Sequence, residues 1–377
     1  MELVFNAEET MLRDTMSRFI EREYSFEARK RRLALPDGFC RDTWKGLAEL
    51  GALAAALPVE AGGLGAGAMG TLIISEACGR GLIVEPYLAT VVLGGGLLEL
   101  AASSAHRPLL ERLADGSCLL AFAHSEPESE SDFGGITTRA METRAGFSLS
   151  GRKSCVIHGA TADTLIVSAC VGGAAADSTR PSLFLVDRRD SALQLRGYRT
   201  IDGLQAADIA FDGVTVPRAA LLGEPGEARP VIDHVIARAN AALCAEATGA
   251  MQSLLERTVA YLRTRQQFGQ PLARFQALQH RMADMAMHVE QARSMAYLAA
   301  LQVDGVDATA RERVVSAAKA RVCIAAGFVG KQAIQLHGGI GMTDALDVSH
   351  YFRRLTAITR TLGDEALHLD RFAAATP

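Results

Sequence analysis

The 377-residue chain lacks the sequence features that define several large classes of protein. Its seven cysteines form no CxxC pair and its nine histidines no HExxH motif, so we expect neither a zinc site nor a disulfide framework. Reduced, mostly buried thiols indicate a cytoplasmic location. The longest apolar run, Ala89–Leu100, is broken by glycines and contains Glu99, so it falls short of the ~20 residues needed to span a bilayer.

A strong charge imbalance is also missing. The chain has 39 Lys and Arg against 43 Asp and Glu, a formal net charge of −4. That balance gives no reason to expect nucleic acid or an anionic membrane as a partner. The apolar fraction of 49% and the charged fraction of 22% are ordinary for a globular enzyme.

Three segments of different texture follow one another. Residues 1–117 show helical spacing of apolar residues, and Asn6 before two glutamates predicts an N-cap. Residues 118–228 consist of short β-branched and aromatic stretches without intervening helical patterns, which predicts strands that pair antiparallel. Residues 229–377 are helical again, with a Met/Ala stripe typical of a bundle core. The predicted fold class is α+β, with an N-terminal helical domain, a middle antiparallel β-domain and a C-terminal four-helix-bundle-like domain.

The segment PVEAGGLG, residues 58–65, is glycine-rich and superficially resembles a nucleotide-binding loop. No strand leads into it, and it has neither a P-loop lysine nor a ribose-binding acid. We therefore interpret it as a tight turn between helices.

Three other motifs are candidates for chemistry. Residues 264–285, TRQQFGQPLARFQALQHRMADM, place Arg265 at a bend between helices, where its guanidinium fork suits a diphosphate. Residues 335–354 contain Gly338 and Gly339, which would let a ligand approach the backbone. Residues 121–140 form a strand followed by a Glu-Pro turn. Taken singly, the arginine could be an exposed helix residue and the glycines an ordinary helix C-cap.

Together these motifs, read as RxxFGxPLxxFQxxQHxxADM, QxxGGxGM and SEPxxxSD, closely resemble the flavin-dependent acyl-CoA dehydrogenases. The resemblance extends over essentially the whole chain and is strongest to small-subunit-type members linked to pimeloyl-CoA or to steroid and other bulky acyl-CoA degradation. It implies domains at 1–117, 118–228 and 229–377. It also implies FAD at a subunit interface, in a homotetramer or in a heterotetramer with a homologous subunit, and electron-transfer flavoprotein as the electron acceptor.

The resemblance also assigns site residues. Those implied for FAD across a dimer contact are Arg265, Phe268, Gln276, Gln335, Gly338 and Gly339. Those implied for the flavin within one subunit are Phe122, His124 and Ser125, with Ser131 near the acyl-CoA entrance. In the strand that the family places beside the flavin, Cys155 replaces an aromatic residue and Ile157 a hydroxyl residue. Asn240 falls near the place of an arginine in many members, and Arg238 is the nearest one here.

The expected reaction removes a proton α to a thioester while a hydride leaves the β carbon for the flavin. A carboxylate in a dry pocket suits the role of base. In most of the family the base is a glutamate directly before a glycine, but that position here is Leu362, before Gly363. The family's second placement falls near Arg238 or Ala239, which are not acids either.

Asp364, Glu365 and Glu246 remain as substitute bases, although Asp364 and Glu365 also lie where an N-cap and first-turn acids belong. Three hypotheses follow. The chain is an acyl-CoA dehydrogenase with a relocated base, acting on a bulky acyl chain; or a base-less flavin-fold subunit that pairs with a catalytic homologue; or a flavin oxidase or monooxygenase on the same fold.

Overall fold

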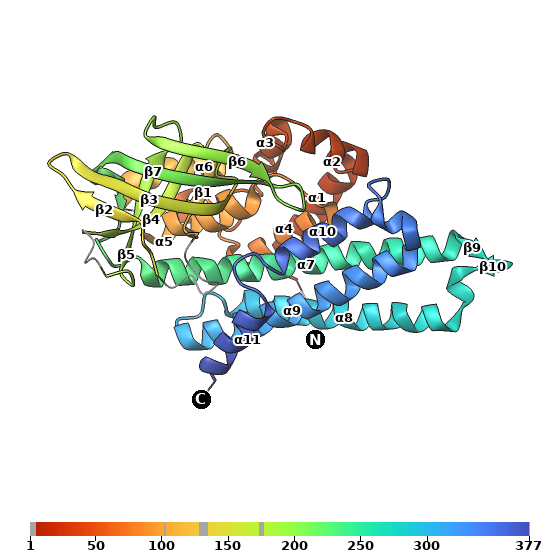
Figure 1. The fold of residues 1–377 in the computed structure, drawn as a ribbon. Coiled ribbons are helices and arrows are strands. Elements are labelled where there is room, and N and C mark those ends of the chain that lie inside the picture. Colours follow the sequence, from red (N-terminus) through yellow and green to blue (C-terminus); the bar gives the residue numbers. More distant parts are fainter. Residues whose placement is uncertain (1–4, 102, 128–134, 173–176, 377) are drawn as a thin grey trace. The chain divides into compact units, whose positions relative to one another are not determined.

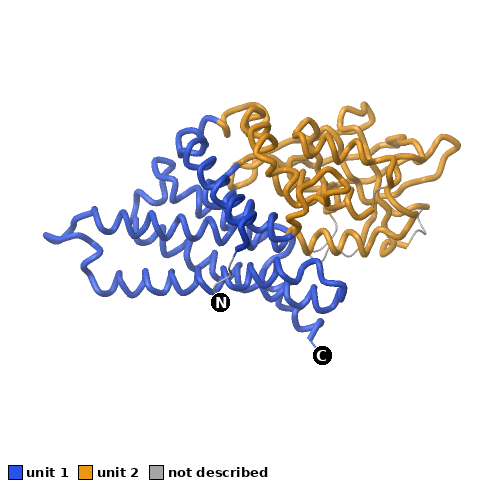
Figure 2. Tube along the Cα trace, turned by 180° about the vertical axis from the view of Figure 1, so that it is seen from behind, with its two compact units in different colours: residues 1–31, 68–83, 240–377 blue, residues 32–67, 84–239 orange. Residues whose placement is uncertain are grey.

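The structure, a computed structural model, describes residues 5–101, 103–127, 135–172 and 177–376. It divides into two compact units, shown in Figure 2. The helical unit contains residues 1–31, 68–83 and 240–377, and the sheet unit contains residues 32–67 and 84–239.

The helical unit begins with a capped helix. In α1 (Ala7–Glu23), Asn6 Oδ1 accepts from Glu9 N at 2.8 Å, and Glu9 Oε2 accepts from Asn6 N at 2.9 Å. This capping box satisfies two of the donors that a helix start leaves free, so the predicted N-cap is confirmed. The other helices that lie at least partly in this unit are α2 (Phe26–Leu33), α4 (Gly67–Gly81), α7 (Arg229–Thr264), α8 (Gln276–Gln302), α9 (Ala308–His337), α10 (Val348–Ile358) and α11 (Glu365–Ala374).

Long helices make the body of this unit. α8 and α9 run side by side, and α10 and α11 also pack on α9 (Figure 1). The buried side of α8 carries the stripe seen in the sequence, with Met285, Val289, Ala292, Ala296 and Ala299 inside. Small residues in such a stripe allow close packing between helices, so the bundle-core interpretation of this stripe is confirmed.

Two glycines bring α4 and α7 into backbone contact. A Cβ at Gly79 would lie 1.8 Å from Glu246 O, and a Cβ at Gly249 would lie 1.9 Å from Glu76 O. No other residue could occupy either position without moving a helix. The approach fixes the part of α7 that carries Glu246.

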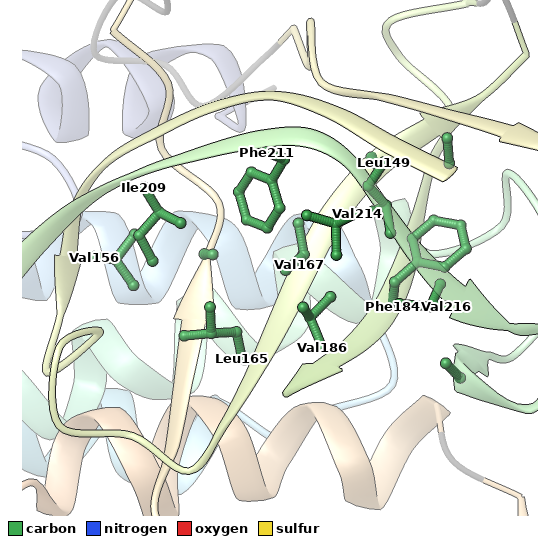
Figure 3. Packing of buried hydrophobic residues seen from close by; sticks show 14 of the residues in the cluster. Leu149, Val156, Leu165, Val167, Phe184, Val186, Ile209, Phe211, Val214 and Val216 are labelled. Carbon is green, nitrogen blue, oxygen red and sulfur yellow. The ribbon is translucent and has the colours of Figure 1, made fainter. Parts of the chain in front are cut away.

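The sheet unit is built on an eight-stranded sheet, ordered β6-β7-β3-β2-β4-β5-β8, with β1 also paired to β4. Its strands are β1 (Leu120–Ala123), β2 (Arg139–Glu142), β3 (Gly146–Ile157), β4 (Thr164–Val171), β5 (Pro181–Asp187), β6 (Leu193–Arg199), β7 (Gln205–Pro217) and β8 (Leu221–Leu222). Figure 3 shows its core, in which side chains from several strands meet, among them Leu165, Val186 and Phe211.

The middle β-domain is confirmed, but the expectation that all of its strands pair antiparallel is wrong. β1 and β2 both pair parallel with β4, in the registers Leu120↔Thr164 and Arg139↔Cys170. A parallel pair needs a long crossover connection, which is usually a helix. Here the connection from β1 to β4 is formed by other strands, β2 and β3, so the sequence shows no helical pattern that would announce it.

Helices also belong to the sheet unit: α3 (Arg41–Glu49), α5 (Gly96–Ala101), α6 (Arg107–Ala114) and a buried π-helical segment, Tyr87–Gly95. The glycine-rich segment at residues 58–65 forms a short 3₁₀ turn ended by Gly62 at φ 83°, as the turn interpretation predicts. The order of helical, strand and helical segments is therefore the predicted α+β class. No helix in the described residues has the length and apolar character that crossing a membrane requires.

Candidate functional site

Residues 361–363 lie in the turn between α10 and α11. This turn contains position 362, where the resemblance to the family predicts a catalytic base. Leu362 has φ 56° and Gly363 has φ 107°, so two consecutive residues leave the usual backbone regions. A left-handed leucine is strained by about 1–2 kcal/mol. Gly363 is required, because an added Cβ would lie 2.7 Å from His368 Nε2.

Buried polar side chains hold this turn by its carbonyl groups. Lys319 Nζ donates to Thr361 O at 2.6 Å and to Asn240 Oδ1 at 3.2 Å. Asn240 Nδ2 in turn donates to Leu362 O at 3.3 Å. Lys319 is fully buried and Asn240 is 1% exposed. Burial lowers the pKa of Lys319, because the charged form loses its hydration.

A third side chain reaches the same turn from α11. His368 Nε2 donates to Leu362 O at 3.1 Å, while its Nδ1 lies 3.2 Å from Ser316 Oγ. Burial, together with the Lys319 charge, lowers the pKa of His368 to about 4, so the ring is neutral at pH 7. Leu362 O therefore accepts two hydrogen bonds from side chains on two helices.

Two of the three candidate bases, Asp364 and Glu246, are engaged by other groups in this structure. Asp364 Oδ1 accepts from Leu367 N at 3.1 Å and its Oδ2 pairs with Arg360 Nη1 at 2.8 Å, which confirms its capping role on α11. Glu365 is exposed in the first turn of the same helix. Glu246 is buried, and Arg354 binds its two oxygens at 2.5 and 2.7 Å.

A hairpin projects at the end of α7, where β9 (Gln266–Gln267) pairs with β10 (Gln270–Pro271). Its two tip residues, Phe268 and Gly269, both have positive φ, 54° and 77°, as a tight two-residue turn requires. Phe268 is 89% exposed and meets Phe275 edge to face. Arg265, just before the hairpin, is also exposed. A strained, exposed aromatic residue is a feature that folding alone does not explain.

The end of α7, which leads into the hairpin, contacts the start of the glycine motif at residues 338–342. Tyr261, one helical turn before Arg265, stacks on His337 with ring centroids 4.4 Å apart, and its hydroxyl donates to His337 O at 3.4 Å. Gly338 follows His337 directly at φ 67°. The structure thus brings together the ends of α7 and α9, which carry two motifs about 70 residues apart in sequence.

Open backbone marks this end of the helical unit. A Cβ added at Gly338 or Gly339 would meet nothing within 4 Å. Gln335 and Gln276 are exposed at the end of α9 and the start of α8. A guanidinium, amides and uncovered backbone suit a phosphorylated ligand, so these residues fit the diphosphate part of a dinucleotide.

The end of β1 holds the other predicted cofactor residues. Phe122 and His124 stack with centroids 4.9 Å apart, and His124 Nδ1 lies 2.9 Å from Ser168 Oγ. Burial, reinforced by the positive charge of Lys153, lowers the pKa of His124 to about 3. Ser125 O accepts from Ser154 N at 2.9 Å, which ties β1 to β3.

β3 bulges beside this point. Its register with β7 shifts between Lys153 and Val156, and Cys155 there is exposed with φ 51°. Cys155 N donates to Asp208 Oδ1 at 3.1 Å. Cys155, which the resemblance places where the family has an aromatic side chain, therefore lies on a distorted, solvent-facing part of the strand.

A buried charge pair fixes the end of β1. Glu126 Oε1 accepts from Lys153 Nζ at 2.7 Å and from Thr138 Oγ1 at 2.6 Å. Burial alone would raise the pKa of Glu126, but the Lys153 ammonium and the threonine hydrogen bonds outweigh it and lower the pKa to about 2. Lys153 also donates to His124 O at 3.0 Å.

Some functional candidates escaped sequence reasoning and one cannot be placed. Ser131 lies outside the described residues. Lys153 shares the strand parity of the buried Phe147 and Leu149, so alternation could have revealed it. Lys319 falls in the buried stripe of α9 between Val315 and Val322. A charged residue at an apolar position was the available signal in both cases. In the described residues, no cluster of three potential ligands could hold a metal ion.

Comparison with known proteins now defines the class. Family descriptions match in chain order: "Acyl-CoA dehydrogenase, N-terminal domain" over residues 6–117, "middle domain" over 121–214 and "C-terminal domain" over 226–376. The mitochondrial short-chain specific acyl-CoA dehydrogenase of Rattus norvegicus is 30% identical over 360 residues, covering 92% of this chain and 85% of that protein. The chain therefore belongs to the acyl-CoA dehydrogenase family, whose members are FAD-dependent oxidoreductases.

Solved structures agree with this assignment. The "Tcur3481-Tcur3483 steroid ACAD G363A variant" has a TM-score of 0.88 and 27% identity, with 98% of this chain and 97% of that chain covered. The ChsE4-ChsE5 complex from Mycobacterium tuberculosis has a TM-score of 0.90 and 25% identity, with both chains covered completely.

Proposed function

We propose that this chain is a subunit of an FAD-dependent acyl-CoA dehydrogenase that acts on a bulky acyl thioester, and that a homologous subunit supplies the catalytic base. One observation carries the proposal: residue 362 is a leucine, held in a turn where the next carboxylate along the chain, Asp364, already caps α11. A leucine takes no proton, so the α-carbon needs another base.

The chain's own residues fit the cofactor. Arg265 would donate to the diphosphate, and the uncovered backbone at Gly338 and Gly339 would let that group approach closely. Phe268 would cover part of the dinucleotide with its exposed ring. Phe122, His124 and Ser125 would line the flavin. When bound, FAD accepts the hydride from the β carbon.

Competing uses of Asp364 and Glu246 support a base supplied in trans, and Glu365 is exposed to solvent, away from the dry pocket that suits a base. Asp364 would have to give up both the α11 cap and Arg360 to reach a substrate. Glu246 would have to give up the two hydrogen bonds that the buried Arg354 donates to its carboxylate, and breaking a buried charge pair is costly. The steroid enzyme and the ChsE4-ChsE5 complex, each named for two components, support a heteromeric assembly. The steroid named for the first of them supports a bulky substrate.

The partners follow from this assignment. Acyl-CoA is the substrate, and electron-transfer flavoprotein is the electron acceptor that we propose. The seven unpaired cysteines fit a reducing compartment, so we propose a cytoplasmic location.

The visible spectrum of the purified protein tests the proposal. We expect a holoprotein whose flavin absorbance shifts on binding octanoyl-CoA or cholyl-CoA but does not bleach. Bleaching should appear when the chain is co-expressed with a homologue that carries glutamate at the position of Leu362. Full bleaching by the isolated chain would contradict a base supplied in trans.

A second candidate keeps the base in this chain. Asp364 is two residues from the position the resemblance marks, and its side chain is 33% exposed. A rearranged turn at Gly363 would let it act as a relocated base. The variant Asp364→Asn distinguishes the two candidates, because it should lower turnover strongly only if Asp364 is the base.

A further inference from the structure

Three helices send buried polar side chains to the same two carbonyl groups. Lys319 of α9 reaches Thr361 O directly, Asn240 of α7 reaches Leu362 O, and His368 of α11 reaches Leu362 O as well. Lys319 and Asn240 also bond to each other. A backbone turn between two helices does not need such support to form, because the α11 cap already defines where that helix begins.

Lys319, the central residue of this network, carries a charge that is energetically costly to bury. Lys319 is fully buried, and in the described part of the chain no carboxylate forms an ion pair with it. Its hydrogen-bond partners are a carbonyl and an amide oxygen, which offset only part of the lost hydration. A methionine of similar length would fill the same space without that cost. The charge therefore points to a requirement other than packing.

The turn itself stores strain. Leu362 has φ 56°, a conformation that a branched side chain disfavours and that persists only where the surroundings dictate it. The surroundings here are the hydrogen bonds from Asn240 and His368 to Leu362 O. The polar network thus holds the backbone of one residue in a particular direction.

We propose that Lys319 is a positioning residue, which acts through Asn240 and the carbonyls of the 361–363 turn to hold side chain 362 against the acyl thioester. This inference rests on the proposed function. It means that the site has kept the support for a base and lacks only the carboxylate. Replacing Leu362 by glutamate should then give the chain a working base, and that base should depend on Lys319.

Hydrogen exchange at the α-carbon isolates this step from electron transfer. The introduced carboxylate takes the α-hydrogen as a proton, the bonding pair stays on the enolate, and a deuteron from D₂O returns to the α-carbon. This exchange itself consumes no oxidant, and with thioester in excess and oxygen excluded, loss of hydride to FAD is limited to one thioester per flavin. The probes are octanoyl-CoA and cholyl-CoA, the protein is the FAD-loaded chain, and the mass gain of the thioester gives the rate.

We expect Leu362→Glu to raise the exchange rate by ~100-fold or more over the wild-type chain, as a placed general base does. Adding Lys319→Met should lower the saturated rate, per bound FAD, at least ~10-fold while the half-saturating thioester concentration stays within about twofold. The matched control is Lys331→Met, an exposed lysine on the same helix, which should change neither value.

A second substitution covers the case in which Lys319→Met fails to fold. Asn240→Asp keeps an oxygen for Lys319 and removes the amide that donates to Leu362 O. In the Leu362→Glu background it should lower the saturated rate in the same way. Equal rates with and without either network substitution would overturn the positioning role.

Different results contradict the proposed function and the positioning role of Lys319. A holoprotein that leaves flavin absorbance unchanged with both thioesters contradicts the proposed function, and the inference falls with it. A holoprotein that binds thioester, yet shows no exchange as Leu362→Glu, contradicts the inference alone.

Discussion

Lys153 Nζ lies 2.7 Å from Glu126 Oε1, and neither side chain has any exposed surface. The pair joins the middle of β3 to the residues that follow β1. Glu126 also accepts from the backbone N–H groups of Thr137 and Thr138, at 2.7 and 3.0 Å. The predicted flavin-lining residues at the end of β1 are therefore fixed by a charge pair that contacts no solvent.

Replacing Lys153 by methionine should destabilise the protein by about 3–5 kcal/mol, because the buried carboxylate of Glu126 would lose its ammonium partner. FAD content should fall as well, since Lys153 also holds His124 O. Urea unfolding followed by circular dichroism measures the first effect, and the ratio of absorbance at 450 and 280 nm the second. Arg152→Met, at the neighbouring exposed position, is the control. A change below 1 kcal/mol would contradict the importance of the pair.

Arg265→Ala should weaken FAD binding by roughly 10- to 100-fold, the usual effect of losing a charge-assisted hydrogen bond. Stability without FAD should not change, because the side chain is exposed. Equilibrium dialysis of apoprotein against FAD gives the affinity. Arg263→Ala, at the exposed position two residues earlier in the last turn of α7, is the matched control. Unchanged flavin affinity in the Arg265 variant would remove that residue from the cofactor site.

Sequence reasoning found what local patterns encode. Apolar spacing revealed the helices, Asn6 and Glu9 the first cap, and the motif at Arg265 a bend that the structure builds as a hairpin. It missed what depends on contacts between distant residues. The parallel pairing of β1 with β4 needs knowledge of which strands meet, and the bond from Lys319 to Thr361 O joins residues 42 apart. A buried lysine in an apolar stripe marks such a contact without naming its partner.

Asp364→Asn tests where the base lies. Asparagine caps a helix about as well as aspartate, so stability should change by less than ~1 kcal/mol. If a homologous subunit supplies the base, turnover of cholyl-CoA by the complete assembly should stay within about twofold of the wild-type value. A loss of ~100-fold or more would instead identify Asp364 as a relocated base. Asp370→Asn, an exposed acid later in α11, is the matched control and should leave both values unchanged.

Gly363→Ala should cost at least about 2–3 kcal/mol of stability. The new Cβ would lie 2.7 Å from His368 Nε2 and 2.8 Å from Leu367 Cδ2, at a φ of 107° that alanine rarely adopts. Gly327→Ala, in the middle of α9 where an added Cβ meets nothing within 4 Å, should be neutral or stabilising by up to about 1 kcal/mol. Thermal unfolding of the two variants provides the comparison. Equal stabilities of the two variants would show that the backbone at residue 363 adjusts to a Cβ atom at little energetic cost.

Acid should destabilise the protein partly through His368. The pKa of His368 is about 4 in the folded chain and 6.5 in the unfolded chain. As the pH falls, the unfolded state therefore binds the proton before the folded state does. Stability from this group is present above pH 6.5 and is lost as pH falls towards 4, by about 3 kcal/mol in total. His124 and His350, with pKa values lowered to about 3 and 4, act in the same direction. Glu85 opposes them, because burial raises its pKa to about 7 and its contribution is lost as pH rises above 4.5.

A variant isolates the His368 contribution from the others. His368→Gln keeps a donor for Leu362 O and has no proton to gain, so its urea stability should fall less between pH 7 and pH 5 than that of the wild type. The difference in slope should approach 1.4 kcal/mol per pH unit below 6.5. His280→Gln, an exposed histidine on α8, should follow the wild-type slope. If the free energy of unfolding falls with pH equally in the His368 variant and the wild type, protonation of His368 does not contribute to acid destabilisation.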